Sequence, residues 1–354
     1  MNESVSYPAS ALMIGRPGEL MSPDSFPASN VIMVRELYSY EGNWLSCSFP
    51  QQDIPAARLG FGLGKFDWAD YGLAQPVSPD ALFYRIEVLT PEGLYACIVA
   101  DESKGAAVES DAGRMDIRLR QDGHAWFRVA GWPEMEWHFE SPDAALGADL
   151  AVSPHHVVLW PDMVMPRNTF ALCLASCVVK GTVSISGRRV AVNGFGFYDH
   201  PRIVVQAHSA PPFGWYLYAP LRFADGTLVV SYYCEDGLGR KDAVYSAGVL
   251  VSPDGTSAWL PHSQVRRLQI DDANLPAGWE AQLGSDRISI TYRVKVKKPR
   301  LAQGWGDAAG EYPAFPLLMQ AEGECWSSSG ARPLRGGSGI AEFVVRAGYQ
   351  PQYP

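Results

Sequence analysis

The fold class is decided by the stretch Ile288-Ser289-Ile290-Thr291-Tyr292-Arg293-Val294-Lys295-Val296. Apolar and polar side chains alternate along it, and a β-strand places alternate side chains on opposite faces. One face of this strand is therefore predicted to pack in a core while Lys295 and the other polar residues meet water. The same period of two recurs at 82–89 and 115–120. The chain is expected to be rich in half-buried strands.

Tight turns separate these alternating runs. They contain glycine, which adopts the positive φ that short hairpins require: Pro91-Glu92-Gly93, Gln121-Asp122-Gly123, Ser186-Gly187-Arg188, Ala224-Asp225-Gly226 and Pro253-Asp254-Gly255. Successive hairpins with one apolar face close into barrels or stack as sandwiches. Two such units fit the length, and Pro161, Pro166 and Asn168 interrupt the pattern between them. We predict an all-β chain with domains at 1–170 and 171–354.

Composition limits the classes of partner. Of 354 residues, 47% are apolar and 19% charged, and the net charge is −9 without a basic run, so nucleic acid is not expected as a partner. No stretch has the roughly 20 apolar residues that a membrane helix needs. The first twenty residues lack the basic start and apolar run of a secretory signal. With six scattered cysteines interpreted as reduced thiols, these features predict a cytoplasmic protein.

Motifs for cofactors and metals are not found. The sequence contains no Walker loop, no H-E-x-x-H and no C-x-x-C, and its histidines and cysteines lack zinc-ligand spacing. The glycine-rich run 60–65 fits no phosphate-binding pattern and is expected to be a loop, with a role as a lid over a pocket as one option. We expect no cofactor and no metal.

The densest group of polar and aromatic residues lies between 194 and 236. Asp199 and His200 stand together, and an acid beside an imidazole can fix its tautomer or supply a proton. Because adjacent strand residues face opposite sides, only one of the two should point into a barrel unless a bulge redirects them. The glycines at 194 and 196 suit a bulge or a close backbone approach. A buried polar pair joining the two halves is the structural alternative.

This region resembles a known group of proteins. The run Gly194-Phe195-Gly196-Phe197-Tyr198-Asp199-His200, followed by Trp215-Tyr216-Leu217-Tyr218-Ala219-Pro220-Leu221 and then Asp225-Gly226, resembles the carotenoid 1,2-hydratase (hydroxyneurosporene synthase) superfamily. That superfamily includes kievitone hydratase-like proteins and lipocalin-like Diels–Alderases. The resemblance covers about 178–253. It implies tandem lipocalin-like β-barrels that hold an apolar small molecule, and it implies roles for Asp199, His200, Trp215, Tyr232 and Asp236.

Three functions remain open. The first is a cofactor-independent cyclase of the Diels–Alderase type, which holds a polyene or polyketide-like intermediate of secondary metabolism in a reactive shape. The second is a hydratase or lyase/isomerase acting on an isoprenoid double bond, and the third is a non-catalytic carrier of lipid or pigment. The candidate catalytic residues are Asp199, His200, Tyr232 and Asp236. The candidate substrate-binding residues are Tyr198, Trp215, Tyr216, Tyr218 and Tyr233.

Overall fold

The structure is a computed structural model. It describes residues 18, 20–26, 40–49, 53–64, 81–101, 107–110, 115–121, 124–141, 143–165, 168–205, 214–235, 244–270, 275–297, 303–305 and 312–345. The chain divides into two compact units. The first comprises Met1–Arg16 and Met21–Ser209, and the second comprises Pro17–Leu20 and Ala210–Pro354. Apart from the short 3-10 helix Pro23–Ser25, every regular element of the described residues is a strand, which confirms the all-β prediction.

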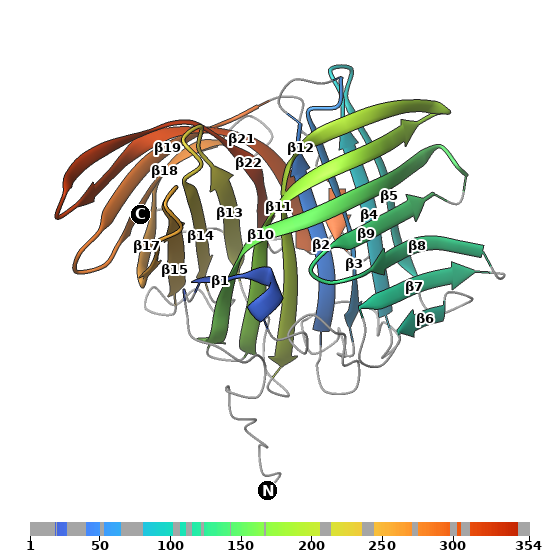
Figure 1. Ribbon diagram of the computed structural model, residues 1–354, viewed down its shortest axis with the longest axis horizontal. Coiled ribbons are helices and arrows are strands. Elements are labelled where there is room, and N and C mark those ends of the chain that lie inside the picture. The colour runs from blue at the N-terminus through green and yellow to red at the C-terminus, as the bar shows by residue number, and fades with distance from the viewer. Residues whose placement is uncertain are drawn as a thin grey trace, which may run out of the picture. The chain divides into compact units, whose positions relative to one another are not determined.

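The first sheet has twelve strands. They are β1 (Leu20–Met21), β2 (Tyr40–Ser48), β3 (Ala56–Gly64), β4 (Ala81–Leu89), β5 (Leu94–Asp101), β6 (Ala107–Ser110), β7 (Asp116–Gln121), β8 (His124–Ala130), β9 (Met135–Glu140), β10 (Leu146–Met165), β11 (Asn168–Ile185) and β12 (Arg188–Val205). Their order is β5-β4-β3-β2-β12-β11-β10-β9-β8-β7-β6, with β1 beside β10 (Figure 1). Thus β2 pairs with β12, which comes about 150 residues later in the chain.

The first sheet curls so that its inner face encloses one hydrophobic core. Phe61 on β3 packs edge-on against Phe127 on β8, with ring centroids 5.1 Å apart. Five strands lie between β3 and β8 in the sheet order, so this contact crosses the interior. Such curling of an antiparallel sheet is the geometry of a lipocalin-like barrel. We call this sheet the first barrel.

The second sheet has ten strands. They are β13 (Trp215–Arg222), β14 (Leu228–Glu235), β15 (Val244–Val251), β16 (Ser257–Leu260), β17 (His262–Ile270), β18 (Pro276–Gly284), β19 (Ser289–Val296), β20 (Gln303–Trp305), β21 (Tyr312–Ser327) and β22 (Gly330–Val345). Their order is β16-β15-β14-β13-β22-β21-β19-β18-β17, with β20 beside β21 (Figure 1). The N–H of Ser263 on β17 donates to Ser246 Oγ on β15, which brings the two ends of the sheet together in a second barrel.

The structure differs from two of the predictions made from the sequence. The predicted boundary after residue 170 falls in the first unit, where β10 and β11 pair from Leu146↔Ile185 to Met165↔Asn168, and the chain instead divides after Ser209. Pro161 lies within β10 and therefore does not end the first barrel, and Pro166 lies outside the described residues. The glycine-rich run at 60–64 is not a loop but the end of β3, paired with both β2 and β4.

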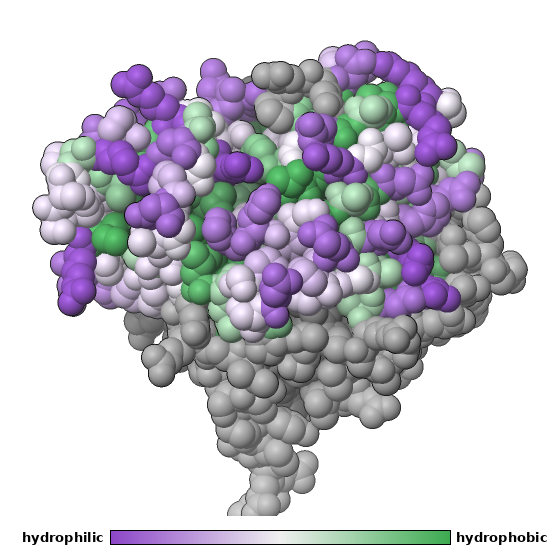
Figure 2. Space-filling model, in the orientation of Figure 1, coloured by the Kyte–Doolittle hydropathy of each residue, from purple (hydrophilic) through white to green (hydrophobic). Residues whose placement is uncertain are grey.

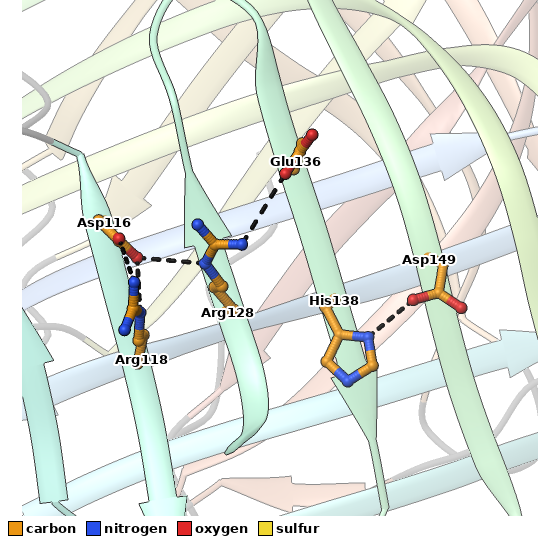
Figure 3. Close-up of polar contacts among 6 residues, drawn as sticks. All are labelled: Asp116, Arg118, Arg128, Glu136, His138 and Asp149. Atoms are coloured by element: carbon orange, nitrogen blue, oxygen red, sulfur yellow. Dashed lines mark hydrogen bonds and ion pairs between the residues drawn. The ribbon is translucent and has the colours of Figure 1, made fainter.

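The outer face of the first barrel carries charged side chains that pair across neighbouring strands. Figure 3 shows Asp116 and Arg118 on β7, Arg128 on β8, Glu136 and His138 on β9, and Asp149 on β10. Their exposure agrees with the alternation predicted for 115–120. In the view of Figure 2 hydrophilic residues cover much of the coloured surface, and the only large hydrophobic side chains exposed among the described residues are Tyr95 and Trp326.

Among the described residues, no helix is long and apolar enough to cross a membrane. All six cysteines are free thiols, and five of them are buried, as the sequence predicted.

Candidate functional site

Polar side chains enter the core of the first barrel from β2 and β12. On β2, Leu45 and Cys47 belong to the inner hydrophobic core, so Asn43 and Glu41 lie in the same phase and on the same inner face. On β12, Tyr198 pairs with Leu45 and therefore shares that face. His200 and Arg202 follow at intervals of two residues, so they also lie on it. The pairing of two distant strands thus places five polar side chains on one inner wall: Glu41, Asn43, Tyr198, His200 and Arg202.

His200, Glu41 and Arg202 form a buried charged cluster. His200 Nε2 lies 3.0 Å from Glu41 Oε1, and Arg202 Nε donates to the same oxygen at 3.0 Å. The exposed fractions of the three residues are 0%, 2% and 2%. Burial of charge is costly unless partners compensate it, so a cluster at this depth requires an explanation beyond ordinary surface pairing.

A second histidine–carboxylate pair on the same barrel provides a contrast. His138 Nδ1 lies 2.7 Å from Asp149 Oδ1, but both side chains are on the outer face, with exposed fractions of 42% and 56% (Figure 3). Solvent screens such a pair, which contributes little to stability or to reactivity. The buried pair differs because it lies in a low-dielectric interior.

The protonation states in the cluster follow from its contacts. Burial by itself raises the pKa of Glu41, but the hydrogen bonds from His200 and Arg202 and the charge of Arg202 outweigh burial and hold that pKa below its ordinary value. Burial lowers the pKa of His200, against the opposing influence of Glu41. At neutral pH Glu41 is a carboxylate and His200 is neutral. A carboxylate only accepts, so His200 Nε2–H donates to Glu41 and the lone pair lies on Nδ1.

Tyr198 and Asn43 form the neighbouring pair on this wall. The Tyr198 hydroxyl donates to Asn43 Oδ1 at 2.6 Å, and burial raises the pKa of Tyr198 well above its usual value, so the phenol stays protonated. This bond fixes the orientation of the Asn43 amide. The indole of Trp137 on β9 packs edge-on against Tyr198 with ring centroids 6.1 Å apart. Both Asn43 and Trp137 are almost fully buried.

Three polar atoms of this interior have no hydrogen-bond partner among the described residues. They are His200 Nδ1, Asn43 Nδ2 and Trp137 Nε1. Buried polar atoms in native proteins are nearly always satisfied by protein or water, so each exception calls for an explanation such as strain, a bound water, an ion or a functional role. One acceptor and two donors on the inner wall of an apolar barrel are the pattern of a small-molecule site.

The buried thiols of the same interior are unsuited to nucleophilic chemistry. Cys47 and Cys173 face the core, and burial raises the pKa of both well above its ordinary value. The thiol rather than the reactive thiolate therefore prevails at neutral pH. Among the described residues, no group of three or more His, Cys, Asp and Glu side chains is arranged to hold a metal ion.

The structure separates the first pair of predicted catalytic residues. His200 points into the first barrel, whereas Asp199 pairs with Trp44 on the opposite face of β12, as strand alternation required. The β12–β2 register passes through this region without a bulge. The glycines instead allow close backbone approach, since a Cβ at Gly194 would lie 2.2 Å from the carbonyl oxygen of Ser48.

The predicted aromatic residues fall into separate groups. Tyr198 lies in the first unit beside His200, and the others lie on β13 and β14 of the second unit. There, Trp215 and Tyr233 pack in the core of the second barrel with centroids 4.9 Å apart, while Tyr232 stacks on Tyr216 at 5.7 Å and contacts Tyr218 on the other face. Asp236 lies outside the described residues. The constellation at 194–236 is thus divided between the two units.

Side chains meet across the interior of the second barrel, as Phe61 and Phe127 do in the first. Tyr292 on β19 reaches across to Ser231 on β14, with 2.7 Å between the two hydroxyl oxygens. Leu283 on β18 packs over Gly248 on β15 so closely that a Cβ on the glycine would lie 2.1 Å from Leu283 Cδ2. The first contact satisfies the Ser231 and Tyr292 hydroxyls, whereas Ser263 Oγ and Trp279 Nε1 have no hydrogen-bond partner among the described residues. The first barrel differs in having the buried cluster of His200, Glu41 and Arg202, and it is therefore the candidate site.

Sequence reasoning missed Glu41, Asn43 and Trp137 as site residues. The signal was present in the run Glu41-Gly42-Asn43-Trp44-Leu45-Ser46-Cys47, where two polar residues share the phase of the apolar positions Leu45 and Cys47. A polar residue at a core position of a strand breaks the binary pattern, and such breaks are expected at functional sites. Trp137 carries no comparable signal, because an indole on an apolar face is ordinary core.

Comparisons with known proteins identify the fold. No protein-family model and no curated protein matches the chain. Among solved structures, a Nitrosomonas europaea protein provisionally named ATTH is 11% identical, with a TM-score of 0.67 over 96% of this chain and 99% of that one. Kievitone hydratase from Nectria haematococca is 8% identical, with a TM-score of 0.56 over 96% and 99%. The protein CghA is 11% identical, with a TM-score of 0.51 over 96% and 97%.

These matches confirm the predicted architecture. The chain shares the tandem β-barrel fold of these structures along nearly its whole length. At this level of identity the likeness establishes the fold, and function has to be argued from the site itself.

Proposed function

We propose that the chain is a cofactor-independent enzyme that adds water to, or removes it from, a double bond of an apolar small molecule in the first barrel. His200 is the proton-transfer residue of this proposal. The single observation that carries it is the lone pair of His200 Nδ1, which is buried without a partner among the described residues while Nε2 is bound to Glu41. A neutral imidazole held in one tautomer by a carboxylate is a general base.

The reaction needs only one proton to be moved and returned. Nδ1 takes a proton from water as the water oxygen bonds to one carbon of the double bond. The π electrons pass to the neighbouring carbon, which then takes the proton back from the imidazolium. The net change is the addition of one water molecule, and the reverse sequence is dehydration.

Glu41 and Arg202 are positioning residues in this scheme. Glu41 accepts the Nε2 proton, fixes the ring and stabilises the imidazolium as it forms. Arg202 keeps Glu41 ionised, and its positive charge opposes protonation of His200 in the resting state. The cluster therefore holds a neutral base next to a permanent anion within an apolar barrel.

The fold comparison supports the class of reaction. One of the proteins with this fold is named a hydratase. That name describes the other protein, and it supports the proposal here only together with the His200–Glu41 geometry. The sequence-derived alternatives also included hydration of an isoprenoid double bond, but with Asp199 or Asp236 as the acid. The proposal replaces that acid with His200, which acts first as a base.

A second candidate is the cyclase predicted first from the sequence. The observation that favours it is the pair of neutral donors, Asn43 Nδ2 and Trp137 Nε1, which could polarise a carbonyl of a folded polyene. Cyclisation would leave the mass of the substrate unchanged and would not require His200 as a base. The two candidates therefore differ in a measurable product.

Product mass tests the proposal. The full chain is incubated in heavy-oxygen water with extracts containing linear polyenes and conjugated ketones, and products are separated and weighed. Hydration adds one labelled water, while cyclisation changes retention without changing mass. His200→Gln, whose amide can still donate to Glu41, is expected to slow water addition by about 10²–10⁴-fold.

His138→Gln is the matched control, because it alters the exposed histidine–carboxylate pair of the same barrel. It should keep the wild-type rate. Full water-adding activity in His200→Gln would contradict the proposal. The contradiction would be stronger if Asp199→Asn abolished that activity. A wild-type protein that alters no compound would also contradict it and would favour the carrier.

A further inference from the structure

Two buried donors in the first barrel lack an acceptor among the described residues, and both side chains contact Tyr198. The Asn43 amide is held by Tyr198 through Oδ1, which leaves Nδ2 without a partner among the described residues. The Trp137 indole packs on the ring of the same Tyr198, and its Nε1 also has none. Two unsatisfied N–H groups in one apolar interior are costly to bury.

Another tryptophan next to Tyr198 does have an acceptor. The rings of Trp132 and Tyr198 have centroids 6.0 Å apart, but the Trp132 Nε1–H donates to the carbonyl oxygen of Pro23 at 3.2 Å. The chain thus satisfies one indole with its own backbone. The indole of Trp137 is more deeply buried and has no acceptor among the described residues, as is also the case for Trp279 in the second barrel.

We propose that Asn43 and Trp137 recognise an oxygen of the ligand, so that the first barrel selects apolar molecules carrying a carbonyl over hydrocarbons of the same shape. This inference deepens the proposed function. It rests on that function because both require the substrate to lie in the interior of the first barrel. A carbonyl oxygen has two lone pairs and can accept from both donors at once.

The ligand chemistry fits the base on the same wall. A carbonyl conjugated to a double bond draws electrons from that bond, so water adds to its far carbon and the proton returns to the carbon next to the carbonyl. Donors at the oxygen stabilise the negative charge that develops there. His200 supplies the base, and the two donors define the substrate class as an apolar conjugated ketone or a compound with an equivalent oxygen.

Binding measurements separate this inference from the proposed reaction. The probes are conjugated ketones of graded size, including β-ionone, each paired with the hydrocarbon that lacks the oxygen. Calorimetric titration of the full chain gives the ratio of the two dissociation constants. Because each hydrogen bond contributes modestly, the wild-type protein is expected to prefer the ketone by about tenfold or more, and the NMR signal of the Trp137 indole N–H should shift with ketone only.

The variants remove one donor each. Asn43→Leu and Trp137→Phe should each reduce the ketone preference by about 3–10-fold, while circular dichroism and melting temperature report whether they fold. Trp279→Phe is the matched control, since Trp279 is a buried indole with an unpartnered Nε1 in the core of the second barrel. It should leave the preference unchanged.

The outcomes distinguish the two proposals. Equal affinity for ketones and hydrocarbons, or no binding of any ketone, overturns the inference and would fit a buried water molecule that satisfies the donors. If Asn43→Leu fails to fold, two measurements still test the inference. They are the shift of the Trp137 indole signal and the ratio of ketone to hydrocarbon dissociation constants in Trp137→Phe. His200→Gln should keep the ketone preference, so its loss of water addition with intact binding concerns only the reaction.

Discussion

His200 and Glu41 are 159 residues apart in the chain, yet His200 Nε2 lies 3.0 Å from Glu41 Oε1 in the core of the first barrel. The contact depends on the antiparallel pairing of β2 with β12, which aligns Glu41 with Arg202. Both partners are almost fully buried, so each needs the other. The consequences for stability and reactivity can be measured.

Arg202→Met should be strongly destabilising. It removes a guanidinium that compensates the buried carboxylate of Glu41, and such losses cost about 3–5 kcal/mol. The double variant Glu41→Gln/Arg202→Met should be less destabilised than Arg202→Met alone, since no uncompensated charge remains. Urea unfolding gives the free energies. The control Arg188→Met breaks the exposed ion pair with Asp53 and should change stability by less than about 0.5 kcal/mol.

Stability should fall on acidification in two steps. The folded-state pKa of His200 lies below its ordinary value of 6.5, so the unfolded chain binds the proton first and the free energy of unfolding decreases as pH falls below 6.5. The lowered pKa of Glu41 has the same sign, and its contribution is lost as pH falls below 4.5. Urea unfolding across this range should give a shallower first step for His200→Gln. An unchanged slope would contradict the assignment.

The proposed water addition should have an acid limb below pH 6.5. Activity requires neutral His200, whose pKa is lowered by burial, so the rate should persist to a lower pH than a free imidazole would allow. Glu41 opposes that lowering. Glu41→Gln should therefore move the acid limb to still lower pH while reducing the maximum rate. The measurement is kcat/KM against pH, and an acid limb above 6.5 in the wild-type protein would exclude His200 as the base.

The bridge across the second barrel should affect stability but not the site. Tyr292→Phe leaves the buried Ser231 hydroxyl without its partner and should cost about 1–3 kcal/mol. Adding Ser231→Ala removes the stranded group, so the double variant should recover part of the loss. Urea unfolding of the four proteins gives the coupling energy. Ketone preference and water addition in Tyr292→Phe should match the wild-type protein if the ligand lies in the first barrel.

Local patterns in the sequence were sufficient for the strands. The alternation at 82–89 and 288–296 gave β4 and β19, and the turn at 186–188 gave the β11–β12 hairpin, because side-chain direction in a strand depends only on its period of two. The same rule correctly assigned Asp199 and His200 to opposite faces. It could not indicate the boundary after Ser209, which depends on which strands pair over long distances.

The strands could be predicted from the sequence, but the composition of the candidate site depends on the tertiary structure. By itself the sequence determined that the chain is all-β with two units and where its turns lie. It also determined that His200 and its sequence neighbours face opposite sides of their strand. Only the tertiary structure decided that β12 would pair with β2, and so that His200 would meet Glu41, and Tyr198 would meet Asn43. The physical reason is that strand register is fixed by the burial of complete faces across the sheet, and distant segments contribute to that burial together.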